Sequence, residues 1–85
     1  MADAIYCFDT ASVRFAVYPD GRRIVAEIQE NPLRDLFGAR GGGDTLVDAY
    51  FEHAELIDAL ALKKHRTAPG RPIVLANSDF SLQSQ

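Results

Sequence analysis

The sequence predicts a small α+β domain, in which a small, mainly antiparallel sheet is packed by one long helix and one short helix. Three observations predict this class. Residues 12–29 alternate between apolar and polar positions around a turn, residues 45–66 repeat apolar positions at helical spacing, and a short apolar stretch follows at 72–76. An early hairpin with a late final strand is typical of α+β domains rather than of regularly alternating α/β folds.

The hairpin is the clearest local signal in the chain. Its first strand (12–18) and second strand (23–29) both alternate apolar and polar residues, which is the period of a half-buried strand. The connecting "YPDGR" supplies proline, aspartate and glycine in the order that a bulged turn requires. The stretch "AIYCF" at 4–8 could add a third, edge strand, which the sequence alone leaves open.

Two helices are expected after the hairpin. Asn31 and Pro32 favour the start of a short helix, and Gly38 favours its end. One long helix is expected over 45–66, because apolar residues recur there at helical spacing. The stripe expected to face the sheet comprises Leu46, Tyr50, Ala54, Ile57, Leu60 and Ala61. The last strand, "PIVLA", is then expected to join the sheet.

The glycine-rich segment 38–44 lies directly ahead of the long helix. Glycine loops at helix N-termini hold phosphate in many proteins, and Arg40 could hold an anion here. However, the segment lacks the Gly-Lys-Ser/Thr ending of a P-loop, and Asp44 places a negative charge where an anion would lie. The sequence therefore favours a flexible hinge over a phosphate site.

Length and composition predict one domain over 1–85, with a core at about 4–80 and a tail at 81–85. Twelve acidic against nine basic residues give a net charge of −3, which argues against bulk attraction to nucleic acid or to an anionic membrane. Cys7 is the only cysteine, so no disulfide can form within the chain. The N-terminal residues do not resemble a signal peptide, and no apolar run approaches the roughly 20 residues of a membrane span. These features predict a cytoplasmic protein with no membrane partner.

Sequence motifs for catalysis are absent. No nucleophile elbow, metal-ligand spacing or dinucleotide fingerprint occurs, which predicts a protein that is not an enzyme and has no cofactor or metal. His53 falls within the apolar stripe, where a packed histidine is favoured over a general base or metal ligand. Asp58 flanks that stripe, where pairing with an arginine of the sheet is favoured over a functional carboxylate with a raised pKa. A small enzyme or ligand binder around these two residues is the least favoured hypothesis.

A second apolar face is expected on the long helix. Phe51, Leu56 and Leu62 fall outside the stripe that faces the sheet, so they predict a further contact with the short helix or with another subunit. The leading hypothesis is therefore a non-enzymatic interaction or accessory domain. It would bind an unidentified protein or self-associate, either through the sheet edge or through this second face.

Basic residues gather in the hairpin and at the end of the long helix. If the two regions adjoin, they could form a local basic patch comprising Arg14, Arg22, Arg23, Lys63, Lys64 and Arg66. The alternative hypothesis is accordingly a weak nucleic-acid-binding or regulatory module. Complementation of the helix dipole and solubility of the hairpin explain the same residues without a ligand, and this explanation is favoured.

The order of four segments resembles a bacterial family of short proteins, domain of unknown function 1488. The segments are "VRFAVYPDGRRIVAEI", "LRDLFG", "AYFEHAELID" and "PIVLANSDF", and the resemblance covers about residues 8–80. The third segment matches the family's aromatic residue, histidine and isoleucine–acid pair at Tyr50, His53, Ile57 and Asp58, and carries Ala54 in place of an arginine. The resemblance implies a small α+β domain of bacterial origin, and it supplies no activity, cofactor or substrate.

Overall fold

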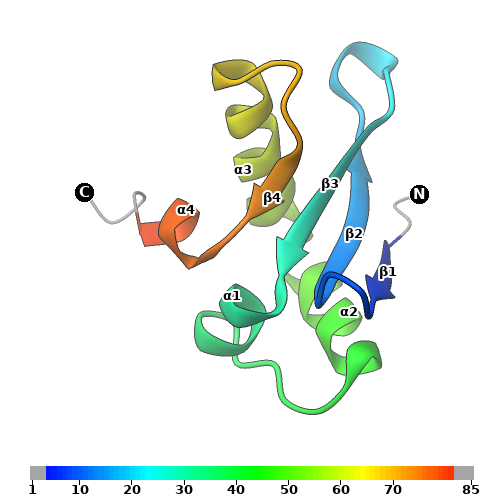
Figure 1. Cartoon of the computed structure of the whole chain (residues 1–85), viewed down its shortest axis with the longest axis vertical. Helices are drawn as coiled ribbons and strands as arrows, with labels where there is room; N and C mark the ends of the chain where they lie inside the picture. The colour runs from blue at the N-terminus through cyan, green and yellow to red at the C-terminus, as the bar shows by residue number, and fades with distance from the viewer. Residues whose placement is uncertain (1–3, 82–85) are drawn as a thin grey trace.

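In the part of the chain that the structure describes, four strands form one mixed sheet in the order β1-β2-β3-β4 (Figure 1). The structure is a computed structural model and describes residues 4–81. The strands are β1 (Ala4–Cys7), β2 (Ser12–Val17), β3 (Ile24–Gln29) and β4 (Ile73–Leu75). The α+β class is confirmed, the predicted hairpin is β2–β3, and the stretch "AIYCF" supplies β1, which pairs antiparallel with β2.

The prediction of a mainly antiparallel sheet is only partly correct, because β4 runs parallel to β3. The connection between them explains this direction. After β3 the chain passes through the helical layer, and α3 returns it to the end of the sheet where β3 begins (Figure 1). A strand reached by such a crossover runs parallel to its neighbour, whereas a tight turn would make it antiparallel.

Residues 4–81 contain four α-helices rather than the predicted long and short pair. They are α1 (Glu30–Asp35), α2 (Gly43–Glu52), α3 (Ala54–Thr67) and α4 (Asn77–Ser81). The single helix expected over 45–66 is wrong, because the chain leaves helical geometry at His53, with φ −123° and ψ 23°. A straight helix of that length would measure about 33 Å, whereas six-residue strands span only about 20 Å. The break lets α2 pack on β1 and β2 while α3 packs on β4 and β2.

The core lies between the helices and one face of the sheet. Two rows of the sheet turn towards the helices, Ala4–Phe15–Ala26–Ile73 and Tyr6–Val13–Ile28–Leu75. The Phe15 ring stacks on the Tyr50 ring with their centroids 4.7 Å apart. Most of the predicted helical stripe is buried, including Leu46, Ile57, Leu60 and Ala61. The helical spacing therefore identified the buried face correctly, although it missed the break.

The short helix ends at Asp35, before the predicted stop at Gly38. Gly38 adopts a left-handed φ of 72°, and the Ala39 N–H donates to the Leu33 carbonyl at 3.0 Å. Glycine tolerates this left-handed position without a Cβ clash, and the Ala39 bond gives a carbonyl of α1 a partner. The helix begins at Glu30, one residue before the expected cap Asn31.

The glycine-rich segment makes specific contacts on its way to α2. Arg34 Nη2 donates to the Gly41 carbonyl at 2.7 Å, and Ala39 is buried. A Cβ added to Gly43 would lie 2.9 Å from the Tyr6 ring, whereas one added to Gly42 would meet nothing within 4 Å. Gly43 is therefore required for the close approach of β1 to the start of α2.

We predict that Gly43→Ala destabilises the protein by about 1–3 kcal/mol, because the new methyl group forces the Tyr6 ring away from α2. Gly42→Ala is the matched control. Its φ of −90° suits alanine, so the free energy of unfolding should change by less than about 1 kcal/mol. Urea denaturation of the two variants provides the measurement, and equal effects would contradict the assignment of Gly43.

Candidate functional site

The outer edge of β1 is free within residues 4–81. β2 pairs with one side of this strand, and no described strand pairs with the other. An edge strand presents unpaired N–H and C=O groups, and proteins commonly block such edges with charged residues, proline or a bulge. The sequence of β1, "AIYC", contains no charge and no proline. The edge is therefore chemically open to a further strand.

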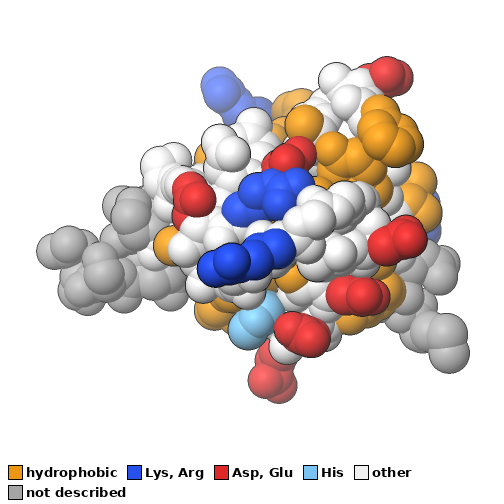
Figure 2. Space-filling model, turned by 90° about the horizontal axis from the view of Figure 1, so that it is seen from below, with side chains coloured by type: hydrophobic (Ala, Val, Ile, Leu, Met, Phe, Trp, Pro, Cys, Tyr) orange, Lys and Arg blue, Asp and Glu red, His pale blue; other side chains and the backbone are white. Residues whose placement is uncertain are grey.

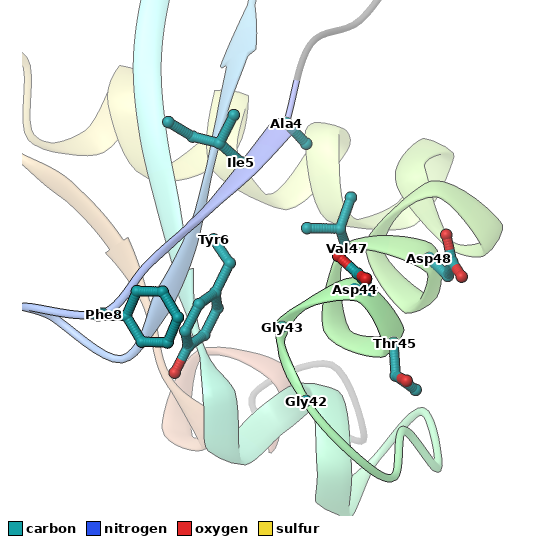
Figure 3. Close-up of a pocket in the computed structure, with 10 residues that line it drawn as sticks. All are labelled: Ala4, Ile5, Tyr6, Phe8, Gly42, Gly43, Asp44, Thr45, Val47 and Asp48. Atoms are coloured by element: carbon teal, nitrogen blue, oxygen red, sulfur yellow. The ribbon is translucent and has the colours of Figure 1, made fainter.

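An open groove runs beside this edge, between β1 and the first turns of α2 (Figure 3). We call it the β1–α2 groove. Its strand side is lined by Ala4, Ile5, Tyr6 and Phe8, and its helix side by Gly42, Gly43, Asp44, Thr45, Val47 and Asp48. The glycine-rich segment thus ends at the groove.

Tyr6 fixes the position of β1 in this groove. Its ring packs against Gly43, and its hydroxyl donates to Glu30 Oε1 at 3.2 Å. Glu30 also accepts from Arg34 Nε at 2.7 Å, and this bond lowers the pKa of the Glu30 carboxyl. Loss of water around Tyr6 raises the pKa of its hydroxyl, and the bond to Glu30 raises it further. One tyrosine therefore ties the edge strand to both α1 and α2.

Apolar side chains project around the edge strand. Phe8 is 86% exposed and Ile5 is 59% exposed. The Phe8 ring lies edge-on against the Tyr6 ring, with centroids 5.0 Å apart. Figure 2 shows hydrophobic side chains gathered on the side of the molecule where β1 lies in Figure 1, with acidic side chains beside them. Exposed apolar patches of this kind commonly mark interaction surfaces.

The helix side of the groove is acidic. Asp44 and Asp48 are both exposed and lie one helical turn apart on α2. Neither carboxylate makes a side-chain hydrogen bond or ion pair with any residue in 4–81. The same described range contains no group of three or more His, Cys, Asp or Glu that could hold a metal ion. The two carboxylates are therefore free to meet charges brought by a partner.

The predicted second apolar face is only partly exposed. Phe51 at the end of α2 is 44% exposed, and Leu56 at the start of α3 is 46% exposed. Leu62 is instead half-buried and packs against the core. The break at His53 places Phe51 and Leu56 on different helices, so they do not form the continuous stripe that one long helix would carry.

Five of the six predicted basic residues divide among three settings. Arg14 pairs with Glu27 at 3.4 Å on the open face of the sheet. Arg22 and Arg66 line a common hollow with His65, between the turn before β3 and the end of α3. Arg23 and Lys63 are exposed and do not line that hollow. The hairpin and the end of α3 therefore adjoin, but they share only part of the expected patch.

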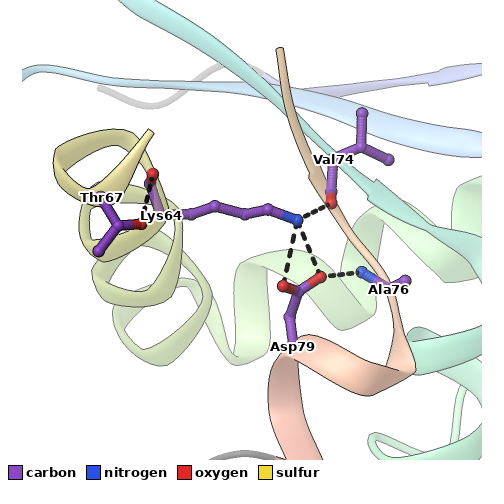
Figure 4. A network of polar contacts seen from close by, with 5 residues as sticks. All are labelled: Lys64, Thr67, Val74, Ala76 and Asp79. Atoms are coloured by element: carbon purple, nitrogen blue, oxygen red, sulfur yellow. Dashed lines mark hydrogen bonds and ion pairs between the residues drawn. The ribbon is translucent and has the colours of Figure 1, made fainter. Parts of the chain in front are cut away.

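Lys64 has a different, structural setting (Figure 4). Its Nζ donates to the Val74 carbonyl at 2.7 Å and lies 3.1 Å from the Asp79 carboxylate. Asp79 Oδ2 also accepts from the Ala76 N–H at 2.8 Å. This network joins α3, β4 and the start of α4, so Lys64 is occupied within the fold.

His53 and Asp58 have separate partners. The His53 ring stacks on the Phe37 ring with centroids 4.3 Å apart, in keeping with a packed histidine. Asp58 Oδ1 accepts from the Tyr50 hydroxyl at 2.7 Å, and not from the arginine expected from the sequence. Burial raises the pKa of the Asp58 carboxyl, and the Tyr50 bond opposes that shift in part. These contacts give both residues a role in packing.

Comparison with known proteins gives no relative: no family model, curated protein or solved structure matches this chain. Within residues 4–81, every helix falls short of the length and hydrophobicity that a membrane span requires.

We predict that Asp58→Asn stabilises the fold increasingly as the pH rises above the ordinary carboxyl pKa of 3.8. Because the folded state raises this pKa, the native protein binds the proton more tightly than the unfolded chain, so ionisation costs stability as the pH rises through this window. Asparagine removes the charge and keeps an oxygen that can accept from Tyr50. Thermal unfolding from pH 3 to pH 7 measures the effect, and a difference that does not vary with pH would contradict it.

Asp58→Ala provides the contrasting variant. It leaves the buried Tyr50 hydroxyl without an acceptor, which should cost about 1–3 kcal/mol at neutral pH. The control is Tyr50→Phe in the same background, which removes the unpaired hydroxyl and should recover part of the loss. Equal stability of the Asp58→Ala and Asp58→Asn variants would show that the hydrogen bond contributes nothing.

Proposed function

We propose that this chain is a small non-enzymatic interaction or accessory domain that accepts a further β-strand at the outer edge of β1. The observation that carries the proposal is an uncharged strand edge beside the β1–α2 groove, with which no strand of the described residues 4–81 pairs. Strand addition to a sheet edge is a common mode of recognition, in which main-chain hydrogen bonds supply affinity and neighbouring pockets supply specificity. A cytoplasmic location and membership of the domain of unknown function 1488 family are part of the same proposal.

Self-association is one form that this function can take. A second copy could pair its own β1 with the free edge, or two copies could meet through Phe51 and Leu56. Both residues are exposed on the helical layer. The two routes are separable, because β1 and the exposed helical residues lie in different elements.

A weaker, second candidate is binding of nucleic-acid phosphates near Arg22 and Arg66. Its support is the common hollow that these residues line with His65, and the lack of any ion pair to them within residues 4–81. Asp20 lines the same hollow and reduces its positive charge. Phosphate contacts would show as binding to generic DNA or RNA at low salt that disappears as salt is added.

We predict that light scattering at increasing protein concentration distinguishes the routes of self-association. If copies pair through β1, Ile5→Lys should lower the average mass, because a charge on an edge strand opposes pairing. Phe51→Glu should have no effect in that case, and it should lower the mass if copies meet through the helical face. A strict monomer that also binds no added strand would contradict the proposed function.

A further inference from the structure

We infer that the segment accepted by the β1–α2 groove is an extended basic segment of another protein, in which basic and apolar residues alternate. This inference rests on the proposed function and adds the chemistry of the partner. It depends on three features of the groove: the open backbone edge, the free aspartates on α2, and the exposed apolar residues of the strand side.

The backbone edge sets the conformation of the partner. A strand added to β1 lies about 4.8 Å from it, and its side chains point alternately to the two faces of the sheet. One set of side chains faces the helical layer, where α2 borders the groove. The other set faces the open side of the sheet, where Ile5 lies in one row with Arg14 and Glu27.

The aspartates determine the charge of the partner side chains that face the helical layer, which are the first set. Asp44 and Asp48 are four residues apart on a helix, which separates them by about 6 Å along its axis. Alternate side chains of a strand are separated by about 6.7 Å, so two basic residues at alternate positions match this spacing. Neither aspartate has an ion-pairing partner within residues 4–81, so a basic segment would supply one for each.

Ile5 determines the character of the second set. It is 59% exposed on the open side of the sheet, so apolar side chains of the partner would cover surface that water now contacts. A β-branched residue suits these positions because it packs well on a pleated surface. Lysine or arginine alternating with valine or isoleucine is therefore the pattern that fits both faces.

A second copy of this chain fits the groove less well. The stretch "AIYCF" that it would contribute contains no basic residue, so Asp44 and Asp48 would gain no ion-pairing partner from that strand. The net charge of −3 on each copy adds repulsion at low salt. Charge complementarity thus favours a basic partner over self-association at this edge.

The test uses three capped hexapeptides titrated into the isotope-labelled protein and followed by amide chemical shifts. They are (Lys-Val)3, (Thr-Val)3 and (Glu-Val)3. The basic peptide should shift amides of β1 and of the first turns of α2, with an affinity roughly five- to tenfold above that of the neutral peptide at low salt. Added salt should reduce this difference, and the acidic peptide should bind most weakly.

Charge variants identify the residues responsible. Asp44→Asn combined with Asp48→Asn should remove the preference for the basic peptide. Glu52→Gln combined with Glu55→Gln is the matched control, because it changes the net charge equally with exposed residues that do not line the groove. Asp44→Lys combined with Asp48→Lys should reverse the preference towards the acidic peptide. Circular dichroism confirms that each variant is folded.

The outcomes separate failure of the inference from failure of the proposed function. Equal binding of the neutral and basic peptides at β1 would overturn the basic partner and leave strand addition standing. A different result would identify a second copy at this edge and overturn the inference. In that case the average mass rises with concentration, Ile5→Lys abolishes the rise, and the basic peptide does not prevent it. A monomeric protein that binds none of the three peptides would overturn both.

Discussion

The side chain of Tyr50 is the contact on which the arrangement of the two layers depends. It is fully buried, its ring stacks on Phe15 of β2, and its hydroxyl bonds to Asp58 of α3. One residue of α2 thereby touches both the sheet and the next helix. The chain breaks at His53, between these two helices, because the strands of the sheet are shorter than the two helices end to end. Tyr50 therefore also determines how α2 and α3 are held together on the sheet.

The sequence predicted the elements whose geometry depends on residues close by in the sequence. The β2–β3 hairpin, the left-handed turn at Gly38 after α1 and the buried face of the helices follow from the period of apolar residues, turn chemistry and a glycine. The break at His53 was not predicted, because no proline or glycine stands there and the cause is the fit of the helices to the sheet. The direction of β4 likewise depends on the path of the whole helical layer.

The sequence suggested a sheet edge as a contact surface, but it did not predict the groove beside β1, for a related reason. Its residues come from β1 and from α2, about forty positions later in the chain, and only the paired sheet brings them together. The glycine-rich segment 38–44 is the nearest local signal, but it does not show which of its glycines matters. Gly43 differs from Gly42 in its requirement for a close neighbour, but sequence gives the two glycines the same appearance. By contrast, the basic residues that the sequence grouped together separate into two kinds. Some, such as Arg14 and Lys64, have an ion-pairing partner, and others, such as Arg22, have none among residues 4–81.

The contact between Lys64 and the Val74 carbonyl has a consequence for the size of any assembly. It gives a main-chain acceptor of β4 a partner from α3, at the opposite edge of the sheet from β1. The two edges are therefore unequal: a main-chain acceptor of β4 already accepts from Lys64, whereas no strand within residues 4–81 lies on the outer side of β1. Pairing at β1 alone uses the same edge of both molecules and ends after one addition. A complex formed through β1 in this way would therefore be finite.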